Sequence, residues 1–455
     1  MNAERSVMAF FEQNDILDDL KGSPPAILVG VSTRDVSAEE AERGLDELER
    51  LLDTAGGRVF ARVMQARPSI DPATVIGSGK VDEIADLCKQ NGVELVIFDM
   101  ELSPAQIRNL EDGIGKDTHG EIRVIDRSML ILDIFALHAT TMEGKVQVEL
   151  AQLKYTAPRL SGHGTEMSRL GGGIGTRGPG ESQLESDRRH MQRRIRALED
   201  QLEEMDKNRR TMRATRQRSG IPTVALVGYT NAGKSTLLNR LTNAGILAEN
   251  KLFATLDPTT RQYNLPGGEK ILLTDTVGFI RKLPHHLIRA FRSTLDEAVL
   301  SDILLILIDA SDPECREQLE CTEALLEELG ASDKPKLYVF NQCDKPEAQA
   351  AFALPGKSAG QGEAVFISAK TGQGLDDLLC KLTALVNGGK TRATFVIPNA
   401  KQGALSKLYA GGASIEDIDY GPEAVTVTAI VDAATRGALR EYDTCPPKTT
   451  EEWEA

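Results

Sequence analysis

Aromatic side chains are scarce in this sequence of 455 residues, at 4% of the total. No run of eighteen apolar residues occurs, so we expect no transmembrane span. The amino-terminal residues carry early acidic side chains and lack the pattern of a signal peptide. The six cysteines are scattered without any C-x-x-C pair, which argues against a zinc site or a disulfide scaffold. A reduced cytoplasmic compartment fits these absences best, with peripheral membrane association as an open alternative.

The net charge of −15 argues weakly against nucleic-acid binding, but the charge is distributed unevenly. Residues 145–220 contain 16 Lys and Arg against 10 Asp and Glu, a net of +6, so the rest of the chain carries −21. A basic segment in an acidic protein is a candidate RNA contact. A solvated helix with many ion pairs would produce the same charge pattern, and charge alone favours it slightly.

Strand and helix patterns alternate in the first part of the chain. The apolar run AILVGVS (26–32) is typical of a strand, and residues 38–56 have the spacing of an amphipathic helix. The alternation continues through VELVIFDM (93–100) to about residue 127. It predicts an α/β domain with a parallel sheet over residues 1–127.

Helical patterns follow. The first runs from Ser128 to about Arg159 and the second from Ser182 to about Arg218, where apolar residues recur at heptad spacing. A glycine-rich stretch separates the two patterns. We therefore expect an antiparallel helical hairpin over residues 128–220, with the glycine-rich loop at its tip.

The last part of the chain divides into two further predicted domains. The strand–helix alternation returns over residues 221–390 and predicts a P-loop domain, with a mostly parallel sheet that has helices on both faces. Residues 391–455 contain patterns for three strands and two helices, which predict a small α+β domain with a tail. The fold class of the whole chain is therefore expected to be α/β.

The sequence TVALVGYTNAGKST (223–236) joins a strand pattern to a helix pattern through G-x-x-x-x-G-K-S. Glycines let backbone N–H groups turn inward around phosphates, and the start of the helix adds a positive dipole. Lys234 would reach the β- and γ-phosphate oxygens, and the Ser235 hydroxyl would meet Mg²⁺. The motif predicts phosphate binding, with an ordinary glycine turn as the alternative.

Two fragments provide candidate ligands for Mg²⁺ and the γ-phosphate. LLTDTVGF (272–279) ends a buried strand with Asp275, which can hold Mg²⁺ through water, and contains Gly278, whose amide can sense the γ-phosphate. FATLDPTT (253–260) supplies Thr255 as a switch residue for both ligands. Each fragment alone is weak, because an aspartate at a strand end is usually a cap or a turn.

Two more fragments predict recognition of the base. Asp344 in Asn341-x-x-Asp344, as a buried acceptor, would take two hydrogen bonds from guanine and reject adenine, which offers no such pair. The backbone of Ser368, Ala369 and Lys370 would face guanine O6. Five fragments in this order together indicate a GTP site.

The expected site residues form three sets. The catalytic set is Lys234, Thr255 and Gly278, and the metal set, for Mg²⁺, is Ser235, Thr255 and Asp275. The nucleotide-binding set is Gly228, Tyr229, Thr230, Asn231, Ala232, Gly233, Lys234, Ser235, Thr236, Phe253, Ala254, Thr255, Leu256, Asp257, Asp275, Thr276, Val277, Gly278, Asn341, Gln342, Cys343, Asp344, Ser368, Ala369 and Lys370.

These motifs carry a family resemblance. GYTNAGKS, FATLDPTT, DTVGF, N-x-x-D and S-A-K resemble a P-loop GTPase of the translation-factor class. Over about residues 25–390 the chain resembles the HflX family of ribosome-associated GTPases (the Obg–HflX type). The fragments that carry this second resemblance are IGSGKVDEI, FDMELSPAQIRNLE, EGKVQVELAQLKY, PRLSGHGTEMSRLGGGIGTRGPGE and QLESDRR.

The resemblance implies an activity and a partner. A member of this family would be a monomer that hydrolyses GTP with Mg²⁺ and binds the large ribosomal subunit and its rRNA. It would split or rescue stalled or stressed ribosomes, with hydrolysis stimulated there. A ribosome-assembly or RNA-binding NTPase that also uses ATP at the amino-terminal domain is the alternative. A nucleoside-triphosphate kinase or metabolic transferase is a rival that would leave Asp344 and S-A-K unexplained, and a binding module that uses GTP only structurally is a second rival.

Two residues depart from the usual GTPase pattern. Gln342 stands where base-recognition motifs usually have a lysine whose stem packs over the base, so nucleotide binding is expected to be weaker. Phe279 stands where many GTPases have a glutamine that orients water. Because a phenyl ring cannot orient water, we expect intrinsic hydrolysis to be slow.

Two glycine-rich spellings are not expected to bind nucleotide. GIGTRG (173–178) matches the G-x-G-x-x-G motif of dinucleotide-binding proteins. That motif needs a strand before it and a helix after it, whereas this segment lies between two helical patterns. IGSGK (76–80) lacks the first glycine of a phosphate loop and is predicted to be a turn that leads into a helix from residue 81.

Arginines mark the glycine-rich loop and the following helix as a candidate RNA surface. Small residues allow close approach to a crowded surface, and arginines pair with phosphates. A flexible linker is the alternative for the loop, and ion pairs with Glu199 and Asp200 are the alternative for the arginines further along the helix. The predicted RNA contacts are Arg159, Arg169, Arg177, Arg188 and Arg189.

Overall fold

The computed structural model places most of the chain in two compact units. The described residues are 24–116, 122–158, 179–218, 221–242, 252–253, 258–281, 287, 291–348, 363–388, 390–401, 403–410 and 413–444. The first unit comprises Met1–Ser219, Leu247–Pro258 and Thr276–Glu297, and the second comprises Gly220–Ile246, Thr259–Asp275 and Ala298–Ala455. Two segments inside the predicted P-loop domain therefore pack with the amino-terminal part of the chain.

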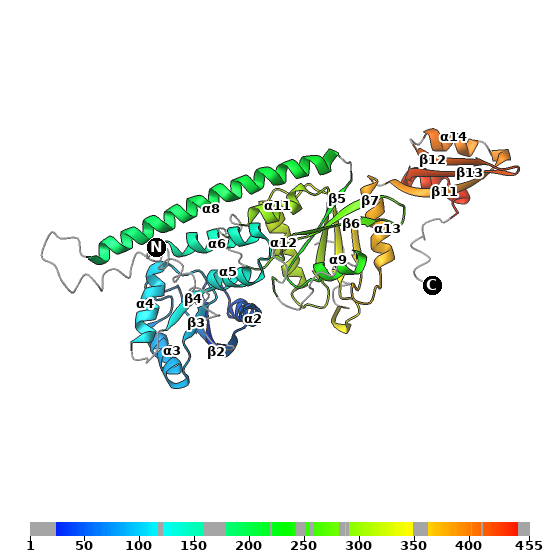
Figure 1. Ribbon diagram of the computed structural model, residues 1–455. Helices are drawn as coiled ribbons and strands as arrows, with labels where there is room; N and C mark the ends of the chain where they lie inside the picture. The colour runs from blue at the N-terminus through cyan, green and yellow to red at the C-terminus, as the bar shows by residue number, and fades with distance from the viewer. Residues whose placement is uncertain are drawn as a thin grey trace. The chain divides into compact units, whose positions relative to one another are not determined.

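The first unit contains a parallel sheet with the strand order β2-β1-β3-β4. Figure 1 labels β2, β3 and β4 of this sheet. All residues of β3 are buried, because a central parallel strand is covered on both faces. The predicted parallel α/β layer is confirmed. Its elements are β1 (Pro25–Ser32), α2 (Ala38–Thr54), β2 (Arg58–Ala66), α3 (Ser78–Asn91), β3 (Leu95–Phe98), α4 (Pro104–Gly115) and β4 (Arg123–Asp126).

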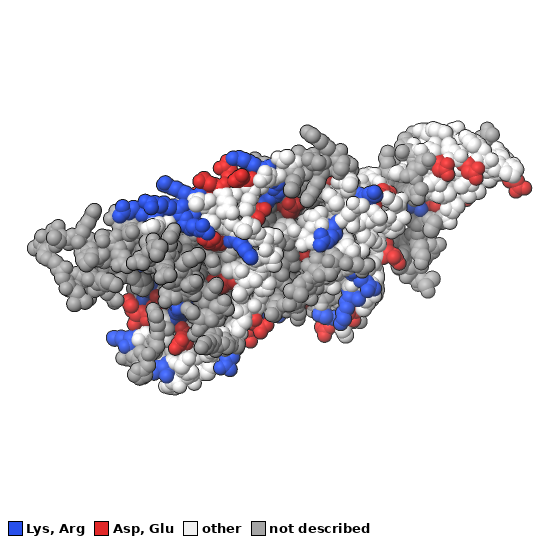
Figure 2. All heavy atoms as spheres, viewed as in Figure 1, with Lys and Arg blue, Asp and Glu red and all other residues white. Residues whose placement is uncertain are grey.

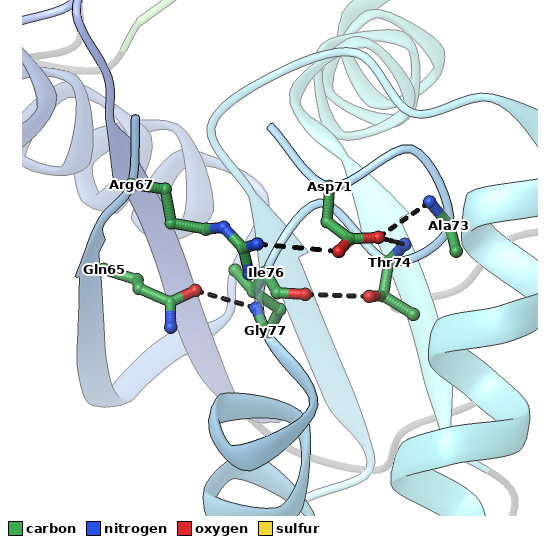
Figure 3. Close-up of polar contacts among 7 residues, drawn as sticks. All are labelled: Gln65, Arg67, Asp71, Ala73, Thr74, Ile76 and Gly77. Atoms are coloured by element: carbon green, nitrogen blue, oxygen red, sulfur yellow. Dashed lines mark hydrogen bonds and ion pairs between the residues drawn. The ribbon is translucent and has the colours of Figure 1, made fainter. Parts of the chain in front are cut away.

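The turn between β2 and α3 contains the IGSGK spelling (Figure 3). The side-chain carbonyl of Gln65 accepts a hydrogen bond from the Gly77 N–H at 2.9 Å, and the Thr74 hydroxyl donates to the Ile76 carbonyl at 2.8 Å. These bonds hold the turn closed on itself. The predicted turn is confirmed, and the helix begins at Ser78, slightly earlier than expected.

The single helical pattern predicted over residues 128–159 is two helices. α5 (Arg127–His138) ends before α6 (Met142–Thr156) begins. Thr141 caps the start of α6, because its side chain accepts a hydrogen bond from the Gly144 N–H. A threonine bonded in this way favours a helix start over a helix interior, which is why the chain breaks here.

α6 packs against α8 (Pro179–Arg218) along an apolar seam. The seam contains five of the residues predicted from heptad spacing. Between α6 and α8 it buries or half-buries Val146, Leu150, Leu153, Met191, Ile195, Leu198, Leu202 and Met205. The loop expected at the hairpin tip, with Arg159, Arg169 and Arg177, lies outside the described residues.

Ion pairs join α6 to α8 across the seam. Arg194 of α8 pairs with Glu149 of α6 at 2.6 Å, and Lys154 of α6 pairs with Glu199 of α8 at 2.7 Å. Glu199, one of the two acidic residues in the alternative of intrahelical ion pairs, thus pairs with a lysine of α6.

The second unit contains a sheet with the strand order β10-β9-β8-β5-β7-β6, in which only β6 is antiparallel to its neighbour. Buried aliphatic side chains from the strands and from α9 and α13 form its core. The predicted mostly parallel sheet is confirmed. The elements are β5 (Thr223–Gly228), α9 (Lys234–Thr242), β6 (Thr259–Asn264), β7 (Lys270–Asp275), α11 (Arg292–Leu300), β8 (Ile303–Asp309), α12 (Cys315–Glu328), β9 (Lys336–Asn341), β10 (Glu363–Phe366) and α13 (Leu375–Val386).

The last module has a three-stranded antiparallel sheet with the order β11-β13-β12. Its strands and helices follow the predicted sequence, and Phe395, Leu408, Val427 and Leu439 lie in its core. Within the described part of the chain, every helix is too short or too polar to cross a membrane. The elements are β11 (Lys390–Pro398), η4 (Asn399–Lys401), α14 (Gly403–Ala410), β12 (Ser414–Tyr420), β13 (Ala424–Asp432), α15 (Ala433–Ala438) and η5 (Arg440–Tyr442).

Replacing Leu198 by alanine should destabilise the first unit. Leu198 is 1% exposed in the seam between α6 and α8, so truncation removes apolar contacts and leaves a cavity. Such a change costs about 2–5 kcal/mol, which denaturant unfolding followed by circular dichroism would measure. The matched control is Gln201→Ala at an exposed position of the same helix. Equal stability of the two variants would contradict the packing described.

Candidate nucleotide-binding site

The loop between β5 and α9 has the backbone that a phosphate loop requires. Gly228 has a φ of 145° and Gly233 a φ of 93°. A Cβ at Gly228 would lie 2.2 Å from the Leu307 carbonyl oxygen, and one at Gly233 would lie 2.2 Å from Asn341 Nδ2. Only glycine fits at these two positions, which lets the loop turn tightly before α9 begins.

Lys234 lies at the start of α9 with its side chain folded into the loop. Its Nζ donates to the Tyr229 carbonyl at 2.7 Å and to the Gly228 carbonyl at 3.1 Å. Burial lowers the pKa of Lys234 to about 8, against the opposing attraction of Asp275. An anionic phosphate beside this ammonium would favour its charged form.

Ser235 and Asp275 form a hydroxyl–carboxylate pair. Asp275 is fully buried at the end of β7, the strand next to β5, and its Oδ2 accepts a hydrogen bond from the Ser235 hydroxyl at 2.6 Å. Both groups offer hard oxygen atoms, which are the ligands that Mg²⁺ prefers. The chemistry of this pair therefore fits the predicted metal.

The residues that follow Asp275 are buried and belong to the first unit. Thr276, Val277, Gly278 and Phe279 are all inaccessible to solvent, and so is Phe253 of the other predicted switch segment. The rest of that segment lies outside the described residues, so the role of its threonine as a metal ligand remains a prediction. The undescribed site residues there are Ala254, Thr255, Leu256 and Asp257.

Asn341 joins the phosphate loop to the S-A-K loop. Its Nδ2 donates to the Ala232 carbonyl at 2.9 Å, and its Oδ1 accepts the Ala369 N–H at 2.9 Å. The side chain is buried, so both bonds form away from water. The structure thus brings three of the five predicted fragments together through one amide.

Asp344 is exposed, and the prediction that it is a buried acceptor was wrong for the ligand-free chain. A hydrogen bond from the Ser368 side chain, with the positive charges of Lys370 and Lys345 nearby, lowers the pKa of Asp344. The carboxylate is therefore ionised at neutral pH and can accept two N–H donors from a base.

Gln342 adopts a φ of 65° and turns towards the end of β8. Its Nε2 donates to Asp309 Oδ2 at 2.5 Å, and Asp309 also accepts a hydrogen bond from the Ser311 N–H at 2.9 Å. Asp309 was not among the predicted site residues. Its position at the carboxyl end of a strand beside β5 and β9 could have indicated it, because ligands bind at that edge of α/β sheets.

A phosphate loop tied by one asparagine to two further loops at the same sheet edge defines a P-loop protein of the GTPase class. Three family models match successive parts of the chain and indicate which GTPases it resembles. Residues 42–136 match the GTP-binding GTPase N-terminal family, residues 138–216 the GTP-binding GTPase middle region, and residues 223–342 the 50S ribosome-binding GTPase family.

Curated relatives extend over most of the chain. It is 48% identical over 415 residues to the GTPase HflX of Lacrimispora saccharolytica, which covers 91% of this chain and 95% of the relative. It is 42% identical over 395 residues to the GTPase HflX of Escherichia coli, covering 87% and 90%. The chain belongs to the HflX family and is a GTP hydrolase.

A solved structure is also similar. It is a GTP-binding protein from the hyperthermophilic archaeon Sulfolobus solfataricus in complex with GDP. The identity is 27%, the match covers 80% of this chain and 99% of that chain, and the TM-score is 0.42.

Gly233→Ala should weaken nucleotide binding. The new methyl group would displace the Asn341 side chain and place alanine at a positive φ. The expected loss of GDP affinity, measured by calorimetry, is about tenfold or more, or roughly 1.4 kcal/mol. Gly330→Ala is the control, because it meets the same strain at φ 76° with nothing within 4 Å. Equal affinities in the two variants would count against the geometry of this loop.

Proposed function

We propose that the chain binds GTP with Mg²⁺ at the loop between β5 and α9 and uses its hydrolysis to act on the large ribosomal subunit. The observation that carries this proposal is the cluster of Lys234, Ser235, Asp275 and Asn341 around that loop. The nucleotide-binding residues are those named from the sequence, and Thr255 is proposed as a further metal ligand.

Mg²⁺ would be held by Ser235 and Asp275. When bound, it would neutralise charge on the β- and γ-phosphates. Lys234 binds the phosphate oxygens, and the Gly278 amide responds to the γ-phosphate. Phe279 is 1% exposed and has no group that orients water. Hydrolysis by the isolated protein is therefore slow, and the ribosome accelerates it.

The basic face of α8 is the proposed contact with rRNA. Arg188 and Arg189 are exposed on α8. Figure 2 shows Lys and Arg gathered along the region of α8 on this face. Arginines on a rigid helix suit the phosphates of structured RNA. Arg159, Arg169 and Arg177 are proposed to extend the same contact.

The biological role follows from the partner. Residues 223–342 match a family described as 50S ribosome-binding GTPase. Splitting or rescue of stalled or stressed ribosomes, by a monomer in the cytoplasm, is the role we propose. Nothing in the turn at IGSGK favours the alternative with a second ATP site, because the Gly77 N–H is engaged by Gln65.

Asp344→Asn should change the base preference. The asparagine amide replaces one acceptor by a donor, which repels guanine N–H groups and suits the 2-oxygen of xanthine. GTP affinity should fall by about a hundredfold, or roughly 2.7 kcal/mol, while xanthosine triphosphate binds better. Competition against a fluorescent GDP analogue would measure both. The control is Asp333→Asn, another exposed carboxylate. Unchanged GTP affinity in Asp344→Asn would remove the base-recognition assignment.

Replacing Arg188 and Arg189 together by alanine should weaken binding to the large subunit. Loss of two phosphate contacts should reduce affinity by roughly tenfold at moderate salt and lower the salt dependence of binding. Sedimentation with purified subunits across a salt series would test this, with GTP binding unchanged. The control removes the same charge from the second unit by Arg316→Ala and Arg440→Ala. If both double variants bind subunits equally, α8 is not the contact.

A further inference from the structure

The two segments that flank the proposed GTP site are anchored in the first unit. Leu252 and Phe253 lie in one segment, and Phe279, Leu287 and Phe291 lie in the other. All five side chains are buried. Burial of each apolar side chain stabilises the folded state by about 1.5–3 kcal/mol. These five side chains therefore hold both segments against the first unit.

α5 supplies the aromatic part of the anchor. The ring of Phe135 packs edge-on against Phe253, with centroids 4.8 Å apart, and against Phe291, with centroids 4.5 Å apart. The Leu252 N–H also donates to the Thr54 hydroxyl of α2 at 3.2 Å. One helix face therefore contacts both segments.

Arg127, at the start of α5, supplies the polar part. Its Nη1 donates to Asp99 at 2.7 Å, and its Nη2 binds Glu47. The same Nη2 donates to the backbone carbonyl of Arg281 at 3.1 Å. Arg281 lies three residues after Gly278, so the arginine fork fixes the main chain just beyond the residue proposed to respond to the γ-phosphate.

The environment of Arg127 makes this fork rigid. Burial would lower the pKa of Arg127, but the carboxylates of Glu47 and Asp99 more than offset it and raise the pKa. A Cβ at Gly44 of α2 would lie 2.1 Å from Asp99 Oδ2, so glycine is needed there to admit the carboxylate. The guanidinium therefore stays charged and has three partners in fixed directions.

The position of the main chain around Gly278 is expected to affect the rate of GTP hydrolysis. Phe279 occupies the position from which a glutamine side chain orients water in many GTPases. Without such a side chain, the placement of the main chain around Gly278 must contribute more to the geometry of attack. Misplacement of reacting groups by about 1 Å can cost a hundredfold in rate. A contact that fixes this main chain therefore bears on catalysis.

We propose that Arg127 is a positioning residue for GTP hydrolysis, which holds the main chain after Gly278 through the Arg281 carbonyl. The proposal rests on the proposed function, in which Gly278 faces the γ-phosphate. Arg127 acts through the backbone and does not touch the nucleotide. A residue that acts in this way changes the rate of hydrolysis and not nucleotide affinity.

Arg127→Lys tests the proposal directly. Lysine keeps the charge between Glu47 and Asp99, but its single ammonium lacks the fork that also reaches Arg281. Steady-state hydrolysis by the full chain should show kcat lowered by about tenfold and the KM for GTP altered by less than about twofold. Unchanged kcat, or a fall in kcat with an equal loss of GDP affinity, would overturn the proposal.

Tyr155→Phe is the matched control for stability. The Tyr155 hydroxyl donates to Asp126, the residue that caps α5, and its loss removes a buried hydrogen bond while every atom of the Arg127–Arg281 bond is kept. This variant should melt at a lower temperature and keep the wild-type kcat. If it lowers kcat as far as Arg127→Lys does, general loosening explains both variants and the positioning role fails.

Gly44→Ala provides a second route if Arg127→Lys does not fold. The added methyl group would clash with Asp99 Oδ2, so the carboxylate that binds Arg127 must shift, while every charge stays in place. We expect kcat to fall by about threefold and amide hydrogen exchange in residues 276–281 to become faster. Wild-type exchange together with wild-type kcat would contradict the proposal.

The proposed GTP site and the positioning role of Arg127 can be tested separately. Unchanged GTP affinity in Asp344→Asn would count against the proposed GTP site itself. If Asp344→Asn lowers GTP affinity as expected while the Arg127 and Gly44 variants keep the wild-type kcat, only the positioning role is lost.

Discussion

A buried guanidinium must be matched by carboxylates, and this requirement organises the first unit. Removing one partner from a buried ion pair costs about 3–5 kcal/mol, because a charge is left unmatched. Arg127 therefore constrains α2 through Glu47 and the end of β3 through Asp99. The sheet, two helices and the segment that contains Arg281 share one electrostatic centre, and the aromatic contacts of Phe135 lie on the same helix.

A single amide has the corresponding role in the second unit. Asn341 uses a donor towards the phosphate loop and an acceptor towards the S-A-K loop, so the two loops share one orientation. The end of a parallel sheet supplies the frame, because β5, β7 and β9 place Gly228, Asp275 and Asn341 at the same edge. Rigid placement of this kind suits the proposed GTP site.

The sequence predicted what depends on neighbouring residues along the chain. The phosphate loop, the parallel sheets and the seam of α8 all follow from local spacing. Contacts that join distant residues were not predictable: Asn341 and Ala232 are 109 residues apart, and Arg127 and Arg281 are 154 apart. The break between α5 and α6 was missed because the spacing of apolar residues does not reveal whether a threonine caps a helix or lies within it. The exposure of Asp344 was missed because a recognition motif describes the bound state and not the free chain.

The division of the chain into units has a consequence for how such a protein can change during evolution. Phe135 contacts Phe253 and Phe291, which follow it by more than a hundred residues. Both lie beyond the break at Ser219 and Gly220 in the sequence but belong to the same unit as Phe135. A recombination event at that break would combine Phe135 from one lineage with Phe253 and Phe291 from another lineage. The two halves of the gene are therefore expected to be inherited together, although each half has the pattern of an independent domain.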